Sequence, residues 1–161
     1  MSRMRSGTAP PQPMRAGSPW RIGIVHSSFY REEVGRIVAG ARKMLEEAGI
    51  ASKNISEHVA AGSFEIPLIG SVLAKAKKVD ALLGIGIIVE GETHHAELLA
   101  RESARGIMDV QLQYGIPFAF EILYVKNLKD AVLRSTGSSN KGAEAARAVL
   151  QSLAEMKRLR S

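Results

Sequence analysis

The nine-residue run from Ala81 to Val89 limits what this chain can fold into more than any other segment. It contains only apolar residues and glycine, and the charged residues Asp80 and Glu90 bound it. A helix that crosses a bilayer needs roughly 20 apolar residues, so this run is far too short to be one. A short, uninterrupted apolar run between charged residues is typical of a strand in the core of a domain.

Predicted strands alternate with predicted helices along the rest of the chain. Apolar runs indicate three more strands, at 22–25, 55–60 and 118–125. Apolar residues at helical spacing indicate helices at about 34–45, 67–73, 93–114, 128–134 and 142–156. This alternation is typical of a parallel sheet with right-handed crossovers. We therefore expect an α/β fold, a three-layer sandwich in which helices cover both faces of a mainly parallel, four-stranded sheet of flavodoxin-like order.

Length and charge indicate one central domain between two basic ends. With 161 residues, 45% of them hydrophobic, the chain is long enough for one domain with a core. We expect a flexible, basic, proline-rich arm at residues 1–20, a single α/β domain at 21–156 and a basic tail at 157–161. The two ends hold three basic residues each, so the other 16 basic residues balance the 16 acidic ones. This pattern favours solvated ends over specific nucleic-acid recognition.

The chain has no cysteine, which excludes both a disulfide framework and a zinc-thiolate site. A reducing cytosol is the natural setting for such a sequence, so we expect a cytoplasmic protein. The arm lacks the apolar segment of a secretory signal, and we expect no membrane partner.

A strand meets a helix at Gly91, just before Glu92 and Thr93. Free backbone N–H groups and the positive end of the helix dipole at such a junction suit a phosphate. The alternative is that Thr93 only caps the helix, as threonine does at many helix N-termini. The two interpretations are compatible.

His94 and His95 are adjacent on the predicted helix and point about 100° apart, so we expect no metal site from this pair. One imidazole near the start of the helix could instead transfer protons near neutral pH. The alternative is an ordinary surface or packing histidine.

Other candidate residues lie near the ends of predicted strands or beside the link 135–140, which is rich in glycine and serine. Arg134 and Lys141 flank this link and could complete an anion site, or they could be ordinary solvated charges. Glu65 could bind a polyhydroxylated ligand, or it could be an acid favoured by a helix N-terminus. Three phenylalanines could stack on a planar ligand or pack in the core: Phe29, Phe64 and Phe120.

Three motifs share their order and spacing with one known family: Gly62-Ser63-Phe64-Glu65-Ile66-Pro67, Gly91-Glu92-Thr93-His94-His95 and Asn140-Lys141-Gly142. The chain resembles 6,7-dimethyl-8-ribityllumazine synthases from about Arg21 to Leu153. The resemblance implies a transferase of riboflavin biosynthesis. It would condense 5-amino-6-(D-ribitylamino)uracil with 3,4-dihydroxy-2-butanone 4-phosphate, releasing phosphate and water. It implies no metal and no organic cofactor.

The resemblance also implies a role for each matched residue. His95 would be the proton-transfer histidine, and Phe29 would stack on the pyrimidine. The other substrate-binding residues would hold the ribityl chain and ring (Ser63, Phe64 and Glu65), contact the uracil through backbone groups (Ile87, Ile88 and Val89), and bind the ketone phosphate (Glu92, Thr93, Arg134 and, nearby, Lys141). Phe120 would close the pocket from a neighbouring subunit. The expected assembly is a homopentamer or an icosahedral shell of sixty subunits, and the short link resembles shell-forming members.

Some positions depart from the family pattern. Glu90 stands where arginine is common, Tyr30 where asparagine is favoured, and Ala61 where proline is common. Glu121 and Tyr124 replace glycine and threonine. None of these removes a matched ligand, but Glu90 and Glu121 add negative charge near an anionic substrate. One alternative is therefore a non-catalytic, flavin- or lumazine-binding or shell-forming relative. A flavodoxin-like mononucleotide binder is a further alternative, but it explains the Gly-x-Thr-x-His pattern less well.

Overall fold

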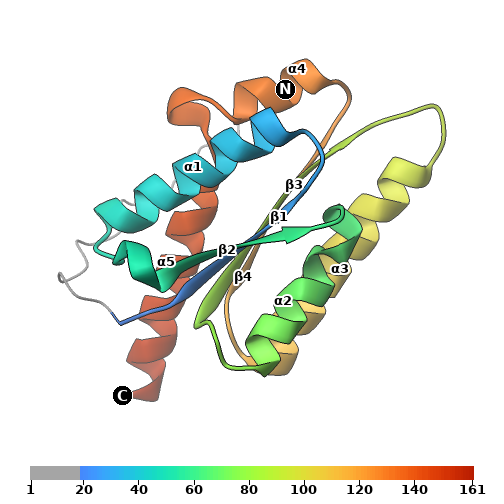
Figure 1. Cartoon of the computed structure of the whole chain (residues 1–161). Helices are drawn as coiled ribbons and strands as arrows, with labels where there is room; N and C mark the ends of the chain where they lie inside the picture. The colour runs from blue at the N-terminus through green and yellow to red at the C-terminus, as the bar shows by residue number, and fades with distance from the viewer. Residues whose placement is uncertain (1–18) are drawn as a thin grey trace.

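The computed structural model describes residues 19–161, so most of the predicted arm at 1–20 lies outside the described residues. Strands and helices alternate along the chain (Figure 1). The strands are β1 (Ile22–Ser27), β2 (Ile55–Ala60), β3 (Ala81–Val89) and β4 (Phe118–Val125). The helices are α1 (Arg31–Glu47), α2 (Ile66–Lys75), α3 (His95–Tyr114), α4 (Leu128–Arg134) and α5 (Lys141–Arg160).

The four strands form one parallel sheet in the order β2-β1-β3-β4, which confirms the predicted flavodoxin-like arrangement. The long apolar run forms β3, which lies between β1 and β4 and is buried from Ala81 to Ile88. Burial on both faces explains why β3 shows no polar alternation. Arg21 and Asp80, just before β1 and β3, form an ion pair at the amino edge of the sheet.

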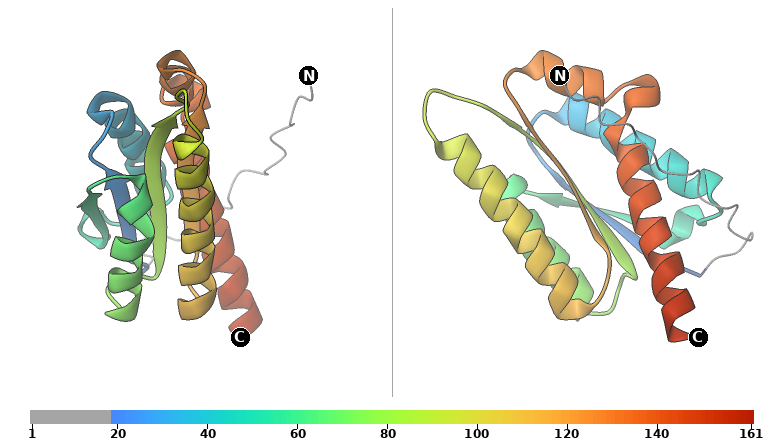
Figure 2. Two further views of the ribbon diagram at one scale, coloured as in Figure 1. Left: turned by 90° about the vertical axis from the view of Figure 1, so that its right-hand side faces the viewer. Right: turned by 180° about the vertical axis from the view of Figure 1, so that it is seen from behind.

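Helices cover both faces of the sheet, which confirms the three-layer sandwich (Figure 2). One apolar core lies between the sheet and the helices α1 and α5, and it includes Ile37, Leu45 and Leu150. The other lies between the sheet and the helices α2 and α3, and it includes Ile66 and Ile107. Among the described residues, no helix is both long and apolar enough to span a membrane.

Two helix ends differ from the sequence-based expectation. The helix predicted from residue 93 begins at His95, two residues later. The last helix continues beyond Met156 to Arg160, so Lys157, Arg158 and Arg160 lie in its final turn. The C-terminal end of a helix dipole is negative, so basic side chains at this position stabilise the helix.

Helices α1 and α5 approach closely where α5 begins, and two glycines allow this contact. A Cβ atom on Gly142 would collide with the backbone carbonyl oxygen of Ile37 in α1. A Cβ atom on Gly40 of α1 would collide with the side-chain amide of Asn140. Gly142 therefore faces a backbone group that cannot rotate away, whereas Gly40 faces a side chain that can.

We predict that Gly142→Ala destabilises the protein by about 1–3 kcal/mol, the usual cost of overpacking, because α1 and α5 must separate to admit the methyl group. Denaturant unfolding checks this. The control is Gly35→Ala in α1, where a Cβ atom has no neighbour within 4 Å. Alanine is the better helix former there, so the control should be neutral or gain up to about 1 kcal/mol. Equal stability of the two variants would contradict the close-contact interpretation.

Candidate functional site

An open pocket of about 530 Å³ lies at the carboxyl edge of the sheet. It is formed by the segments after β1 and β2, the end of β3 and the first turn of α3. Its lining residues are Phe29, Tyr30, Gly62, Ser63, Phe64, Glu65, Ile87, Ile88, Val89, His95, Ala96 and Leu99. Eight residues predicted as site residues from the sequence therefore come together: Phe29, Ser63, Phe64, Glu65, Ile87, Ile88, Val89 and His95.

The segment after β1 holds Phe29 at the pocket. The Phe29 backbone N–H donates to Ser27 Oγ at 3.3 Å, and Ser28 Oγ donates to the carbonyl oxygen of Ala61 at 2.7 Å. The first bond holds the turn after β1 and the second ties the ends of β1 and β2 together, while Phe29 is left 61% exposed. Tyr30 follows with a positive φ of 50°. Asparagine visits this left-handed region more readily than tyrosine, so Tyr30 holds a backbone conformation that is unfavourable for its residue type.

The segment after β2 packs against Phe29. A Cβ atom on Gly62 would lie 3.2 Å from Glu65 Oε2 and 3.5 Å from a ring carbon of Phe29, so the glycine lets the aromatic ring and the carboxylate approach. Ser63 is buried, and its carbonyl oxygen accepts a bond from Ser103 Oγ at 3.3 Å. The Glu65 carboxylate thus lies beside an exposed aromatic face.

The end of β3 presents a strand edge to the pocket. Pairing between β1 and β3 ends with His26 opposite Ile85, whereas β3 continues to Val89 alongside β4. The last four residues of β3 therefore extend past the β1 ladder. Backbone N–H and C=O groups on such an edge can bind a ligand that carries complementary donors and acceptors.

The two histidines lie in different environments, and only His95 belongs to the helix. His95 is the first residue of α3 and lines the pocket, whereas the His94 side chain is 96% exposed and lies 3.9 Å from the Glu97 carboxylate. Thr93 is not the N-cap residue of α3, because the helix begins two residues after it. Its hydroxyl still accepts a bond from the His95 N–H at 3.4 Å.

The other predicted site residues do not line this pocket: Glu92, Thr93, Phe120, Arg134 and Lys141. Phe120 lies on the edge strand β4 and is 44% exposed. The Arg134 Nη1 donates to the Asp130 carbonyl oxygen at 3.0 Å, and the Lys141 ammonium pairs with Glu144 at 2.7 Å. Within one chain, therefore, the structure assembles only part of the predicted site.

Four lining residues were not predicted as site residues: Tyr30, Gly62, Ala96 and Leu99. Tyr30 and Gly62 adjoin predicted site residues in the sequence. Leu99 lies one helical turn after His95, so the i, i+4 rule would have found it. No feature of the sequence indicates that Ala96 lines the pocket.

Glu121 of β4 lies on the face of the sheet covered by α5, where it is half-buried. Burial raises the pKa of Glu121 to about 7; the Glu144 carboxylate raises it as well, while the Lys141 ammonium acts in the opposite direction. A substantial share of Glu121 is therefore uncharged at neutral pH. This reduces the negative charge that the sequence alone placed near an anionic substrate.

We predict that Glu121→Gln stabilises the protein at high pH. An ordinary glutamate has a pKa of 4.5, so between pH 4.5 and about 7 the folded chain keeps a proton that the unfolded chain loses. Wild-type stability therefore falls through this window and stays lower above it. Denaturant unfolding at pH 4 and pH 8 should show a gain for Glu121→Gln only at pH 8. The control is Glu47→Gln on the surface of α1, and a gain of equal size in both variants would contradict the assignment.

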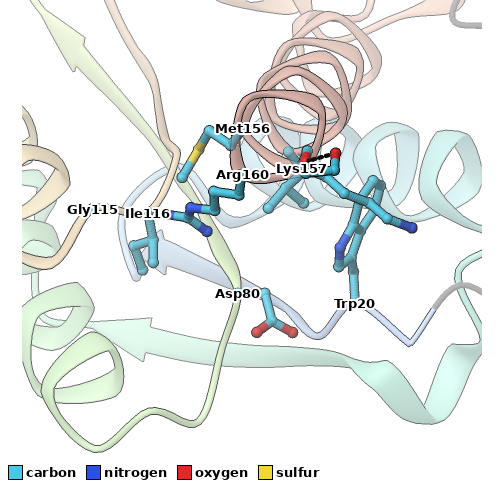
Figure 3. A pocket seen from close by; sticks show the side chains of 9 residues that line it. Trp20, Asp80, Gly115, Ile116, Met156, Lys157 and Arg160 are labelled. Carbon is cyan, nitrogen blue, oxygen red and sulfur yellow. Dashed lines mark hydrogen bonds between the residues drawn. The ribbon is translucent and has the colours of Figure 1, made fainter.

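A second pocket, of about 420 Å³, lies at the opposite edge of the sheet, before the first residues of the strands (Figure 3). Trp20, Ile116 and Met156 form apolar walls, and Lys157 and Arg160 extend over it from the end of α5 (Figure 3). It shares no residue with the pocket at the carboxyl edge. In parallel α/β sheets the carboxyl edge is the usual ligand site, which favours the first pocket.

The fold and the first pocket define a class: a parallel α/β sandwich that binds a small molecule at the carboxyl edge of its sheet. Residues 19–157 match the family model of 6,7-dimethyl-8-ribityllumazine synthase. The chain belongs to this family, whose members are transferases.

Curated relatives of that name cover most of the chain. A protein of Ruthia magnifica subsp. Calyptogena magnifica is 35% identical over 139 residues, which is 83% of this chain and 83% of the relative. One of Stenotrophomonas maltophilia is 37% identical over 139 residues, covering 86% and 90%. One of Neisseria meningitidis is 36% identical over 130 residues, covering 81% and 82%. All three are called 6,7-dimethyl-8-ribityllumazine synthase.

Proposed function

We propose that this protein condenses 5-amino-6-(D-ribitylamino)uracil with 3,4-dihydroxy-2-butanone 4-phosphate to form 6,7-dimethyl-8-ribityllumazine, with release of phosphate and water. One observation carries the proposal: a single pocket gathers an exposed aromatic ring, a carboxylate, an open strand edge and an imidazole, at Phe29, Glu65, the end of β3 and His95. The family membership supports the same reaction. A cytosolic location fits the cysteine-free sequence, and no feature of the described residues favours a non-catalytic relative.

Each part of the pocket suits one part of the pyrimidine substrate. Phe29 offers a ring face on which the planar uracil can stack. The free edge of Ile87 to Val89 can hydrogen-bond to the donors and acceptors of the uracil. Glu65 and the backbone around Ser63 can accept and donate bonds to ribityl hydroxyls. Held in this way, the amino group of the pyrimidine faces the end of the pocket where His95 lies.

The chemistry requires orientation and proton transfer rather than a strong nucleophile. The substrate amine attacks the ketone to form an imine with loss of water, phosphate is then eliminated, and attack of the second amine on the remaining carbonyl closes the ring with loss of another water. Each step moves a proton, and an imidazole titrates near neutral pH. Fixing two reactants in a productive geometry supplies much of the rate enhancement in such a reaction.

An assay with both synthetic substrates tests the proposed function. It follows lumazine absorbance and released phosphate in parallel. One phosphate should appear for each lumazine, at a rate well above that of the two substrates mixed without protein. Absence of lumazine formation above this background would contradict the proposed activity.

The phosphate half of the site is proposed to come from a neighbouring copy. Phe120, Arg134 and Lys141 do not line the pocket of their own chain, and an interface between copies would bring them to the pyrimidine half. Exposed apolar side chains on α2, α3 and β4 support such an interface: Leu68, Val72, Leu98, Met108, Leu112, Phe120 and Tyr124. We propose a homopentamer, or a sixty-subunit shell of pentamers, in which Glu92 and Thr93 of one copy meet Arg134 of the next at the phosphate.

We predict that Arg134→Ala raises the KM for the ketone phosphate by about 10- to 150-fold and leaves the KM for the pyrimidine nearly unchanged. A hydrogen bond to a charged group contributes about 1.5–3 kcal/mol, which corresponds to that range. Steady-state kinetics with each substrate varied in turn measures both values. The control is Lys129→Ala, an exposed cation on the same helix. Equal increases in both KM values would count against the assignment of Arg134.

We predict that His95→Ala lowers kcat by about 10²- to 10⁴-fold, the usual contribution of general acid–base catalysis, with little effect on pyrimidine binding. The matched control is His94→Ala, whose side chain points into solvent and should matter little. A smaller loss at His95 is compatible with catalysis dominated by orientation. If His94→Ala has the lower kcat of the two, or if neither substitution changes kcat, the assignment of proton transfer to His95 is wrong.

A further inference from the structure

The side chain of Asn140 joins three helices at one point. Its Nδ2 donates to the carbonyl oxygen of Arg36 in α1 at 2.9 Å and to that of Ser135 at the end of α4 at 3.0 Å. Its Oδ1 accepts from the Gly142 N–H at the start of α5 at 2.8 Å. One amide thus satisfies both carbonyls and caps α5.

The surroundings of Asn140 keep the amide in place. Gly40 of α1 lies against it, and any side chain at that position would occupy the space of the amide. The Arg36 Nε donates to Ser135 Oγ at 3.2 Å, and Ser135 is buried. The end of α4 is therefore bound to α1 by two separate contacts.

Two cations of the proposed phosphate site flank the joined points. Arg134 is the last residue of α4, immediately before Ser135, and Lys141 is the first residue of α5, immediately after Asn140. The intervening link, with the sequence Ser-Thr-Gly-Ser-Ser, contains one short 3₁₀ turn at Gly137–Ser139, and the hydrogen bonds of the Asn140 side chain fasten its two ends to each other and to α1.

We propose that Asn140 is a positioning residue that sets the separation of the Arg134 guanidinium and the Lys141 ammonium, and that Gly40 provides the space for it. This inference rests on the proposed function, in which both cations serve the ketone phosphate. Two cations held at a fixed separation bind a phosphate better than two that must be ordered on binding. Gly40 acts from another helix, 100 residues earlier in the chain, without touching the substrate.

Gly40→Ala is the most informative variant, because its methyl group displaces the rotatable side chain of Asn140 and not the backbone. Alanine also favours the helix, so α1 should remain folded. Asn140→Asp is the second variant; it keeps the oxygen that caps α5 but loses the N–H donors to Arg36 and Ser135. Gly35→Ala is the matched control on the same helix, in open space.

The experiment measures kcat and both KM values with the full chain, together with the Kd of inorganic phosphate and the melting temperature. Gly40→Ala and Asn140→Asp should each raise the KM for the ketone phosphate and the Kd for inorganic phosphate about tenfold, with the pyrimidine KM within twofold of wild type. The double variant should be no worse than the more damaged single variant, because both changes remove the same contact. Gly35→Ala should match the wild type.

The inference is overturned if Gly40→Ala leaves both phosphate readouts unchanged, or if both KM values rise together in step with a loss of melting temperature. Failure of the proposed function gives a different result, because the wild type would then form no lumazine. Phosphate binding still decides the inference in that case. Binding that depends on Arg134 and weakens in Gly40→Ala supports it, and absence of phosphate binding in the wild type refutes it.

Discussion

The site depends on the length of β3 relative to its neighbour β1. β3 is buried on both faces and pairs with β4 up to Val89, but its pairing with β1 stops at Ile85. Because β1 ends early, the chain turns away there and places Phe29 beside the end of β3 that β1 does not pair. β2 ends opposite β1 and delivers Gly62 to Glu65 to the same place. The staggered ends of three parallel strands thus create an open strand edge with an aromatic ring and a carboxylate beside it.

The two halves of the proposed active site use different kinds of support. The pyrimidine half is built mainly on strand ends. The register of the strands determines which residues lie at the edge of the sheet. The phosphate half is built on the ends of α4 and α5, joined by a short link with one 3₁₀ turn, and its geometry depends on the contact between α1 and α5. Gly142 brings these helices together, and Asn140 transmits the contact to the flanking cations. Glu121, half-buried beneath α5 and partly protonated near pH 7, adds less than one full negative charge near this half.

Much of the fold could be predicted from the sequence because it follows from local rules, whereas several pocket residues, among them Ser63 and Ile87 to Val89, were indicated only by the family resemblance. The run from Ala81 to Val89 identified the central strand, and strand–helix alternation then required a parallel sheet with ligand residues at one edge. The remaining features depend on contacts between distant segments. Asn140 hydrogen-bonds to α1, and Gly40 leaves space for its amide. Both features depend on how α1 and α5 cross, which hydrophobic periodicity does not encode. The late start of α3 and the left-handed backbone at Tyr30 are set by the loops that join the strands to their helices.

The central claim is that one active site combines halves of two neighbouring chains, and complementation between inactive variants tests it most directly. Arg134→Ala and His95→Ala chains are unfolded, mixed in equal amounts and refolded together, and the lumazine-forming activity of the mixture is compared with that of each variant refolded alone. If the halves come from different chains, about one interface in four combines two intact halves, and the mixture should recover about a quarter of wild-type activity. If the mixture is no more active than the average of the two variants, both residues act within one chain and the shared-site account is wrong.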